Sequence, residues 1–224
     1  MNDSNLDFFA VASHELRSPI AIIRGFAELL QDQPSLNQEM VQDISEKIFR
    51  NSLRLEKLVK SLLLLADVEN SASLSLQQAP ILPFIEHCKE IVLAKHPEAH
   101  IVIECPDRKI TVEADVDLLE LAIINLLENA IKYSPPPGKI NICISGSDAK
   151  TSIAIQDQGI GIAPEHVPHI FDRFYSADKA LSRKLGGAGL GLSLVKTIVE
   201  KHGGSMAVQS KQGQGSVFTI VLPN

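Results

Sequence analysis

The pattern of apolar positions divides the chain into two regions. In residues 41–65, apolar side chains recur at alternating spacings of three and four, with Asn51 as one polar position in the series. The same spacing holds in residues 9–30, and Pro34 lies in the polar stretch that interrupts it. Such spacing is typical of a seam between packed helices. We therefore expect two long helices joined by a short turn.

The second helix is expected over residues 36–69, with Ser35 and Gln38 forming a capping box at its start. A lone hairpin leaves its apolar stripe facing water, whereas a second copy would cover that stripe in a four-helix bundle. We therefore expect a homodimer through the N-terminal helices. Asn51 either fixes the register of the bundle or is a tolerated, hydrated layer, and the pattern favours neither interpretation.

After the polar linker at residues 70–73, short β-type runs alternate with helical stretches. Strands are expected at residues 100–104, 139–145, 152–156 and 216–221, and helices at residues 82–95, 115–133 and 190–202. Mixed elements of these lengths predict a two-layer α/β sandwich. The expected fold class is α+β with two domains, a helical hairpin over residues 1–70 and a sandwich over residues 74–224.

Composition and charge narrow the function classes. The 224 residues, with 45% hydrophobic content, are enough to bury two small cores. A net charge of −6 without a Lys/Arg run disfavours a nucleic-acid binder. Three cysteines without a Cys-x-x-Cys pair argue against a disulfide framework or a zinc site and fit the cytoplasm. No apolar stretch is long enough to span a membrane, so we expect no membrane contact within this chain, and any membrane segment must lie outside it.

The first expected helix carries a candidate nucleophile. Leu16 belongs to the seam, so His14, about 200° away around the helix, should face outward. Arg17 and Ser18 follow at i+3 and i+4 and share its surface. A neutral imidazole nitrogen can attack phosphorus while Glu15 holds or accepts the proton of the other nitrogen. Glu15 is therefore a candidate general base.

Taken alone, these residues also fit an ordinary surface histidine beside a solubilising glutamate. Pro19 favours a functional site, because a proline inside a helix costs about 3 kcal/mol and removes a backbone hydrogen bond. A bend with a purely structural role is the alternative.

Three segments of the second region suit a nucleotide, and the first is the helix expected over residues 115–133. Asn125, Asn129, Lys132 and Tyr133 lie on one face of it, while the intervening apolar residues can face the sheet. The amide oxygen of Asn129 suits Mg²⁺, and Lys132 offsets phosphate charge. The alternative is an amphipathic helix with an ordinary polar face.

The second segment, residues 157–162, directly follows a β-type run. Gly159 and Gly161 permit close approach to a flat ring, and the carboxylate of Asp157 can accept a hydrogen bond from the amine of adenine. Alone, this motif is weak, because glycine-rich turns after strands are common.

The third segment, residues 186–192, contains four glycines before and at the start of an expected helix. Backbone amides at such a helix start form a phosphate cradle. The polar, irregular residues 171–185 resemble a mobile lid, with Lys179 and Arg183 as candidate phosphate contacts. Neither a Walker loop nor a Rossmann fingerprint fits this spacing.

Taken in order, these segments resemble the catalytic core of the sensor histidine kinases over nearly the whole chain. Six segments are similar to conserved motifs of that family. They are the phosphoacceptor box (residues 14–19), the asparagine box (125–134), the first glycine box (157–161), the phenylalanine box (171–175), the second glycine box (187–192) and a terminal glycine turn (213–216). The resemblance implies a HisKA-type dimeric four-helix bundle followed by a GHKL-type ATP-binding sandwich with the Bergerat fold.

The resemblance also implies an activity. ATP-dependent autophosphorylation of His14 would be followed by phosphotransfer to an aspartate on the receiver domain of a response regulator. ATP and Mg²⁺ are the implied cofactors, with Asn129 as the metal ligand. The implied ATP-binding residues are Asn125, Asn129, Lys132, Tyr133, Asp157, Gly159, Gly161, Ile162, Lys179, Arg183, Gly187, Gly189, Leu190, Gly191 and Leu192.

Asn125 bears on the class of enzyme. Related hydrolytic ATPases usually carry a glutamate there to activate water, and asparagine cannot act as that base, which favours transfer to His14 over hydrolysis. Three residues depart from the family pattern. Ser18, which with Arg17 is a candidate for an auxiliary or phosphatase role, replaces a frequent threonine, and Ala188 and Ser176 replace a threonine and an arginine. The alternatives are an ATP-binding dimeric scaffold without kinase activity and a GHKL-type ATPase.

Overall fold

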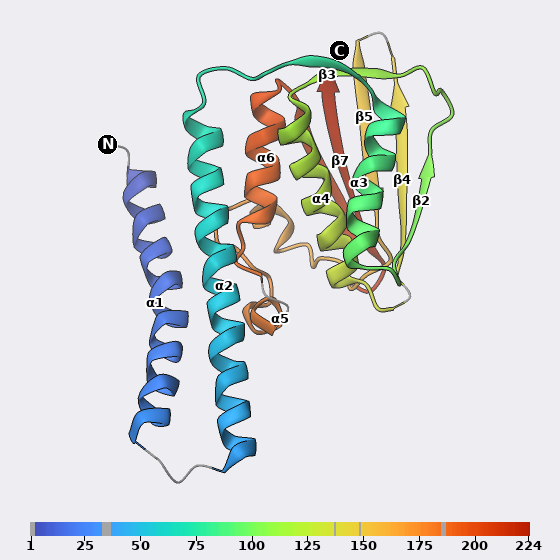
Figure 1. Ribbon diagram of the computed structural model, residues 1–224. Coiled ribbons are helices and arrows are strands. Elements are labelled where there is room, and N and C mark those ends of the chain that lie inside the picture. Colours follow the sequence, from blue (N-terminus) through green and yellow to red (C-terminus); the bar gives the residue numbers. More distant parts are fainter. Residues whose placement is uncertain (1–2, 33–36, 137, 148, 185–186) are drawn as a thin grey trace.

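The computed structural model describes residues 3–32, 37–136, 138–147, 149–184 and 187–224. It consists of a helical hairpin packed beside an α/β sandwich (Figure 1). The hairpin is formed by α1 (Asp3–Asp32) and α2 (Gln38–Asn70), and α2 lies between α1 and the sandwich. The two long helices and the sandwich predicted from the apolar pattern are therefore confirmed.

The predicted seam is the buried face of α2. Ile44, Leu58 and Leu65 are buried, whereas Val41, at the first seam position, is 39% exposed. Helix α2 begins two residues later than predicted. Its N-cap is Asn37, whose side chain accepts a hydrogen bond from the backbone N–H of Met40 at 2.8 Å. The predicted capping residue Ser35 lies outside the described residues.

Helix α1 continues through Pro19, and the ring of this proline is buried. Because proline has no N–H, the carbonyl of Glu15, four residues earlier, has no donor from that position. One backbone hydrogen bond of the helix is thus missing beside His14, although the helix itself does not end there.

The sandwich is built on a five-stranded sheet in the order β2-β4-β5-β7-β6. Strands β2 (His100–Glu104) and β4 (Lys139–Gly146) are parallel, and every other pair is antiparallel, with bounds β5 (Lys150–Gln156), β6 (Ser205–Lys211) and β7 (Gly215–Pro223). Alternate residues of the central strands are fully buried, among them Ile140, Ile142, Ile153 and Ile155.

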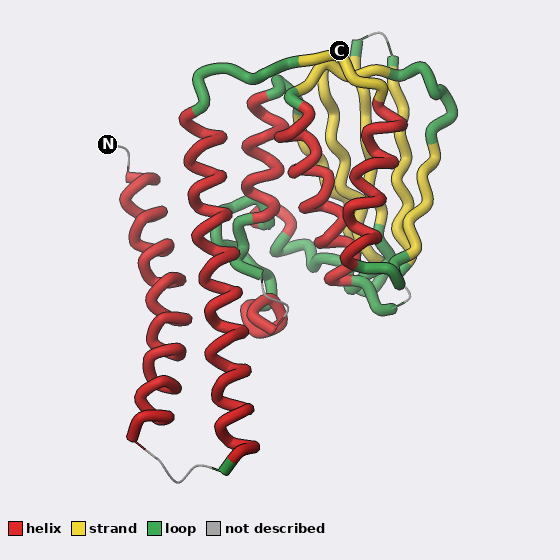
Figure 2. The backbone as a smooth tube through the Cα atoms, in the orientation of Figure 1, coloured by secondary structure: helices red, strands yellow, loops and turns green. Residues whose placement is uncertain are grey.

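Three helices cover one face of this sheet (Figures 1 and 2). They are α3 (Ile81–Lys95), α4 (Val116–Tyr133) and α6 (Gly191–Lys201). The predicted N-cap of α4 is confirmed, since the Asp115 side chain accepts a hydrogen bond from the N–H of Leu118 at 3.3 Å. Leu119, Ile123 and Leu126 of α4 are buried against the sheet and the neighbouring helices.

The sequence pattern missed the shortest and most polar elements. Strands β1 (Gln77–Pro80) and β3 (Thr111–Ala114) form a separate antiparallel pair, and β6 lies at the edge of the main sheet. Met206 and Val208 of β6 pack against the core, but no residue of this strand is fully buried, and Ala207 and Ser210 interrupt the alternation of apolar and polar residues. A 3₁₀ turn, η1 (Val167–His169), and a short helix, α5 (Lys179–Lys184), lie in the segment predicted to be irregular.

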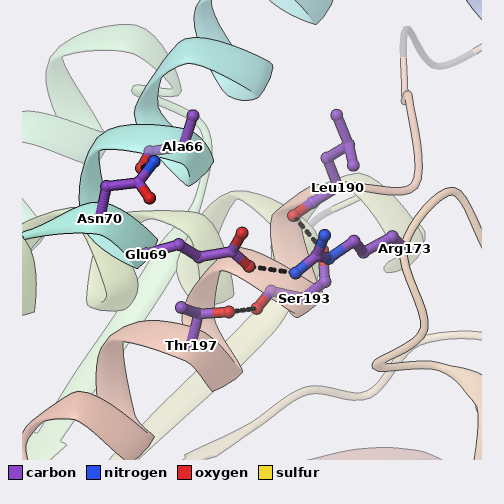
Figure 3. A network of polar contacts seen from close by, with 7 residues as sticks. All are labelled: Ala66, Glu69, Asn70, Arg173, Leu190, Ser193 and Thr197. Atoms are coloured by element: carbon purple, nitrogen blue, oxygen red, sulfur yellow. Dashed lines mark hydrogen bonds and ion pairs between the residues drawn. The ribbon is translucent and has the colours of Figure 1, made fainter. Parts of the chain in front are cut away.

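The hairpin and the sandwich are joined by specific contacts. Arg173 forms an ion pair with Glu69 of α2, next to the start of α6 (Figure 3). The guanidinium of Arg173 also lies 4.8 Å from the ring centre of Phe8 on α1, and that ring lies 5.7 Å from the ring of Phe174. Lys201 donates to the carbonyl of Ser71 at 2.7 Å. None of the helices described combines the length and apolar character needed to cross a membrane.

Candidate active site

A cleft of about 480 Å³ lies where α4, the loop after β5 and the start of α6 meet, and α2 forms one of its walls. All three segments that the sequence singled out contribute to it. Their lining residues are Asn125, Asn129, Lys132, Tyr133, Asp157, Gly161, Ile162, Gly187, Gly189, Leu190, Gly191 and Leu192.

Gly159 is the predicted residue with a described position that is not part of the cleft lining. It is buried, and a Cβ there would overlap the carbonyl oxygen of Tyr133, which also accepts a hydrogen bond from the N–H of Ile160 at 3.1 Å. Gly161 has a φ of +64°, and a Cβ there would overlap the backbone of Lys211. The sequence predicted that both positions are glycine because a ligand ring approaches them closely. In the structure, both are glycine because another segment of the backbone lies against them.

The two asparagines of α4 face the beginning of α6. The side-chain N–H of Asn125 donates to the carbonyl of Leu121 at 2.8 Å, which turns its oxygen toward Gly191. A Cβ at Gly191 would lie 3.1 Å from that oxygen and 3.9 Å from the amide nitrogen of Asn129. Glycine at this position therefore lets the first amides of α6 share one cleft with both side-chain amides.

Lys132 supplies a positive charge at the glycine-rich segment. A Cβ at Gly187 would lie 2.5 Å from its Nζ, and the same Nζ lies 4.9 Å from the ring centre of Tyr133. Burial, together with the positive charge of Lys57, lowers the pKa of Lys132 to about 8. Among the described residues, no carboxylate forms an ion pair with this ammonium group, so an anionic ligand would relieve both effects.

Asp157 is 6% exposed at the end of β5. Its Oδ1 accepts hydrogen bonds from the N–H groups of Gly159 at 2.8 Å and Ser216 at 3.2 Å. Burial raises the pKa of this carboxyl, and the two backbone amides act in the opposite direction. Because both amides bind Oδ1, the second oxygen can accept a hydrogen bond from a ligand amine.

The predicted lid is fixed to the glycine-rich segment at one end. The N–H of Phe174 donates to the carbonyl of Gly189 at 2.8 Å, and both residues have positive φ, +63° and +72°. The hydroxyl of Tyr175, which lines the cleft, lies 2.7 Å from Nδ1 of His166. The side chains of the two predicted phosphate contacts, Lys179 and Arg183, lie outside the described part of the chain.

His14 faces solvent, as predicted, with 73% of its side chain exposed. Its Nδ1 lies 3.7 Å from one oxygen of Glu15, and the other oxygen of Glu15 lies 3.6 Å from the guanidinium of Arg54 on α2. Arg17 is exposed and Ser18 is half-buried. The orienting arginine was missed in the sequence, since nothing in the pattern of α2 indicates which residue of α1 it meets.

The cleft and His14 are separate in this arrangement. Lys57 and Ser61 of α2 line the cleft, whereas no described residue of α1 does. Figure 1 shows α2 between α1 and the sandwich. The sequence also missed these two α2 residues, because only the packing of the two parts brings them to the cleft.

Two family models match this chain. The His Kinase A (phospho-acceptor) domain matches residues 4–71, and the histidine kinase-, DNA gyrase B- and HSP90-like ATPase matches residues 114–224. Sensor histidine kinase YkoH of Bacillus subtilis (strain 168) is 33% identical over 97% of this chain and 47% of its own length. The chain spans about half the length, or less, of the curated relatives it matches.

Solved structures match it as well. The mycobacterial sensor histidine kinase MprB is 30% identical, and the match covers 66% of this chain and 97% of that chain with a TM-score of 0.58. The histidine kinase ThkA, in a crystal structure with the response regulator protein TrrA, matches 97% of this chain and 61% of that chain with a TM-score of 0.80. At 23% identity, the likeness to ThkA concerns the fold, and it extends over the hairpin and the sandwich together.

Proposed function

This chain belongs to the sensor histidine kinase family, and on that premise we propose that it is the catalytic core of an ATP-dependent protein-histidine kinase. The hairpin, residues 1–70, carries the phosphoacceptor, and the sandwich, residues 74–224, binds ATP. The observation that carries the proposal is the pairing of an exposed imidazole and a carboxylate at its Nδ1, in a chain that also contains a phosphate-compatible cleft.

The arrangement at His14 favours attack through Nε2. Glu15 lies 3.7 Å from Nδ1, and at hydrogen-bonding distance it would hold a proton on that nitrogen and leave the lone pair on Nε2. Nε2 then bonds to the γ-phosphorus as the bond from phosphorus to the β,γ-bridging oxygen breaks and ADP leaves. Arg54 keeps the Glu15 carboxylate in place, because it contacts the oxygen that does not face the ring.

The cleft residues position the nucleotide rather than perform covalent chemistry. Asp157 accepts the amine of adenine, and Lys132 with the amides at Gly189 and Gly191 binds the phosphates, whereas the N–H of Gly187 donates to the carbonyl of Ser182 at 2.8 Å. The polar face that Asn125 and Asn129 turn toward Gly191 supports this assignment. Asn125 has no basic group to activate water, which supports phosphoryl transfer over hydrolysis.

Asn129 is our candidate ligand for Mg²⁺. This ion usually keeps few protein ligands and binds through one or two of them together with substrate phosphates. An amide oxygen of Asn129 beside the start of α6 fits that requirement. When bound, Mg²⁺ would offset the charge of the phosphates and favour loss of ADP.

The protein acts as a homodimer through the hairpin, and the sandwich moves before transfer. Ile20 and Val41 belong to the predicted seams, yet they are 50% and 39% exposed in a single chain. A second hairpin would cover them in a four-helix bundle. Because α2 separates the cleft from α1 in one chain, transfer requires the sandwich to undock or to reach the partner's hairpin.

The phosphoryl group then passes from His14 to an aspartate of a receiver domain docked on the hairpin. The phosphorus–nitrogen bond breaks, and an acyl phosphate forms on the aspartate. The exposure of His14 supports access by such a partner, and ThkA, which shares the fold, was solved with a response regulator protein. Arg17 and Ser18 flank the histidine and would contact the same partner or a water that removes the phosphate.

The test is incubation with γ-labelled ATP and Mg²⁺. The expected result is a label on the protein that acid removes and that is absent in His14→Ala and Asn129→Ala. His87→Ala is the matched control, because His87 is also an exposed helical histidine beside a glutamate. Two rival functions predict other results. An ATP-binding scaffold would bind nucleotide without becoming labelled, and an ATPase would release phosphate equally well in His14→Ala.

A further inference from the structure

One basic residue of α2 differs from all the others in its surroundings. Lys47, Arg50, Arg54 and Lys60 each form an ion pair with a carboxylate, within α2 or across the hairpin. Lys57 forms none among the described residues, and it is the basic residue of α2 that lines the cleft. Nothing in the described structure neutralises its charge.

The cleft brings Lys57 near a second lysine without a carboxylate partner. Lys132 lies on α4 of the sandwich, and its ammonium group is close enough to Lys57 for the two charges to influence each other. Two cations from different parts of the chain thus face one cavity, together with the hydroxyl-bearing Ser61 one turn further along α2. Lys132 is half-buried and Lys57 is exposed at the mouth of the cleft, and like charges brought near each other there repel unless an anion lies between them.

We propose that Lys57 binds the phosphate chain of the nucleotide, so that one ligand is held by the sandwich and by α2 of the hairpin at the same time. This inference rests on the proposed nucleotide site. It adds a binding residue from α2, the second helix of the hairpin, to a site otherwise built from the sandwich. It also explains why the cleft has a wall from α2: the phosphates offset the repulsion between Lys57 and Lys132 and hold the two parts together.

The test compares binding of Mg-ATP and of adenosine to the full chain by calorimetry. Adenosine has the base but no phosphates, so it reports damage to the cleft that does not involve the phosphate contacts. Lys57→Ala should weaken Mg-ATP binding about tenfold, as expected for loss of one charge-assisted hydrogen bond, and change adenosine binding less than twofold. Lys57→Arg should keep Mg-ATP affinity within about threefold, because it keeps the charge.

Lys60→Ala is the matched control. Lys60 lies one turn away on α2 but is paired with Glu56 and does not line the cleft, so its loss should change Mg-ATP affinity less than twofold. Equal effects of Lys57→Ala and Lys60→Ala would overturn the proposal, and so would equal losses of ATP and adenosine affinity in Lys57→Ala. Failure of the unmodified chain to bind either ligand would instead reject the nucleotide site itself.

Discussion

Lys132 has the surroundings that we expect of a residue that binds an anion. Its ammonium group is half-buried, it faces Lys57, and it has no carboxylate partner among the described residues. These conditions lower its pKa to about 8, well below the ordinary value for lysine. A phosphate group beside it would reverse the shift, because an opposite charge favours the protonated form.

We expect ATP affinity to depend on pH through Lys132. Since its pKa is about 8 in the nucleotide-free protein and higher in the complex, binding near pH 8 takes up protons. The association constant should be nearly constant below pH 8 and fall by up to about tenfold per pH unit above it. Calorimetry in two buffers with different ionisation enthalpies measures the proton uptake. Lys132→Arg, which stays charged, should remove both effects; a pH profile unchanged in that variant would contradict the assignment.

His202 holds α6 to the beginning of α4. Its ring is 8% exposed, Nδ1 donates to the carbonyl of Ile198 at 2.8 Å, and Nε2 accepts from the N–H of Asp115 at 3.0 Å. Asp115 in turn caps α4 and accepts a hydrogen bond from the N–H of Ser75. The two helices that form the cleft are therefore fixed to each other at the end remote from it.

Replacement of His202 should destabilise the sandwich. His202→Ala leaves the N–H of Asp115 without its acceptor in a half-buried position, at a cost of about 1–3 kcal/mol. Urea unfolding measures the change in the free energy of unfolding. His87→Ala, at an exposed position of α3, should change it by less than about 0.5 kcal/mol. Similar values for both variants would show that the hydrogen bonds of His202 contribute no stability.

The sequence predicts the long elements that bury one face and expose the other. The seam of α2, the N-cap at Asp115 and the amphipathic face of α4 all follow from local pattern, because each depends on spacing within one helix. The weakly buried β6 and the small β1–β3 pair do not, since half or more of their positions are polar.

Contacts between segments far apart in the sequence also cannot be predicted from local sequence patterns. The candidate site residues on α4, after β5 and at α6 are predicted from their motifs and from the resemblance of the order of these motifs to that of the family. The contribution of Lys57, the contact of Arg54 with Glu15 and the burial of Gly159 depend on packing between parts of the chain far apart in sequence. In the same way, the glycines after β5 are explained by the backbone of Lys211 and Tyr133, which no motif reveals.

In a single chain, the hairpin leaves apolar seam residues in water. Ile20→Glu places a charge where the second hairpin would pack, and we expect it to convert a dimer into a monomer with the chain mass of 24.4 kDa. Light scattering after size-exclusion chromatography measures the mass. Leu76→Glu is the control, since Leu76 is equally exposed but lies between α2 and β1, and it should remain dimeric. A monomeric unmodified chain would contradict the bundle.

In the proposed mechanism, an imidazole outside the cleft accepts the γ-phosphoryl group of a nucleotide bound within it. The decisive measurement is the position of phosphorus on the protein after reaction with Mg-ATP, by ³¹P and ¹⁵N nuclear magnetic resonance. Because Glu15 lies at Nδ1, the phosphoryl group should be on Nε2 of His14. Phosphorus on Nδ1, on another residue, or on no residue of a protein that binds Mg-ATP would contradict this mechanism.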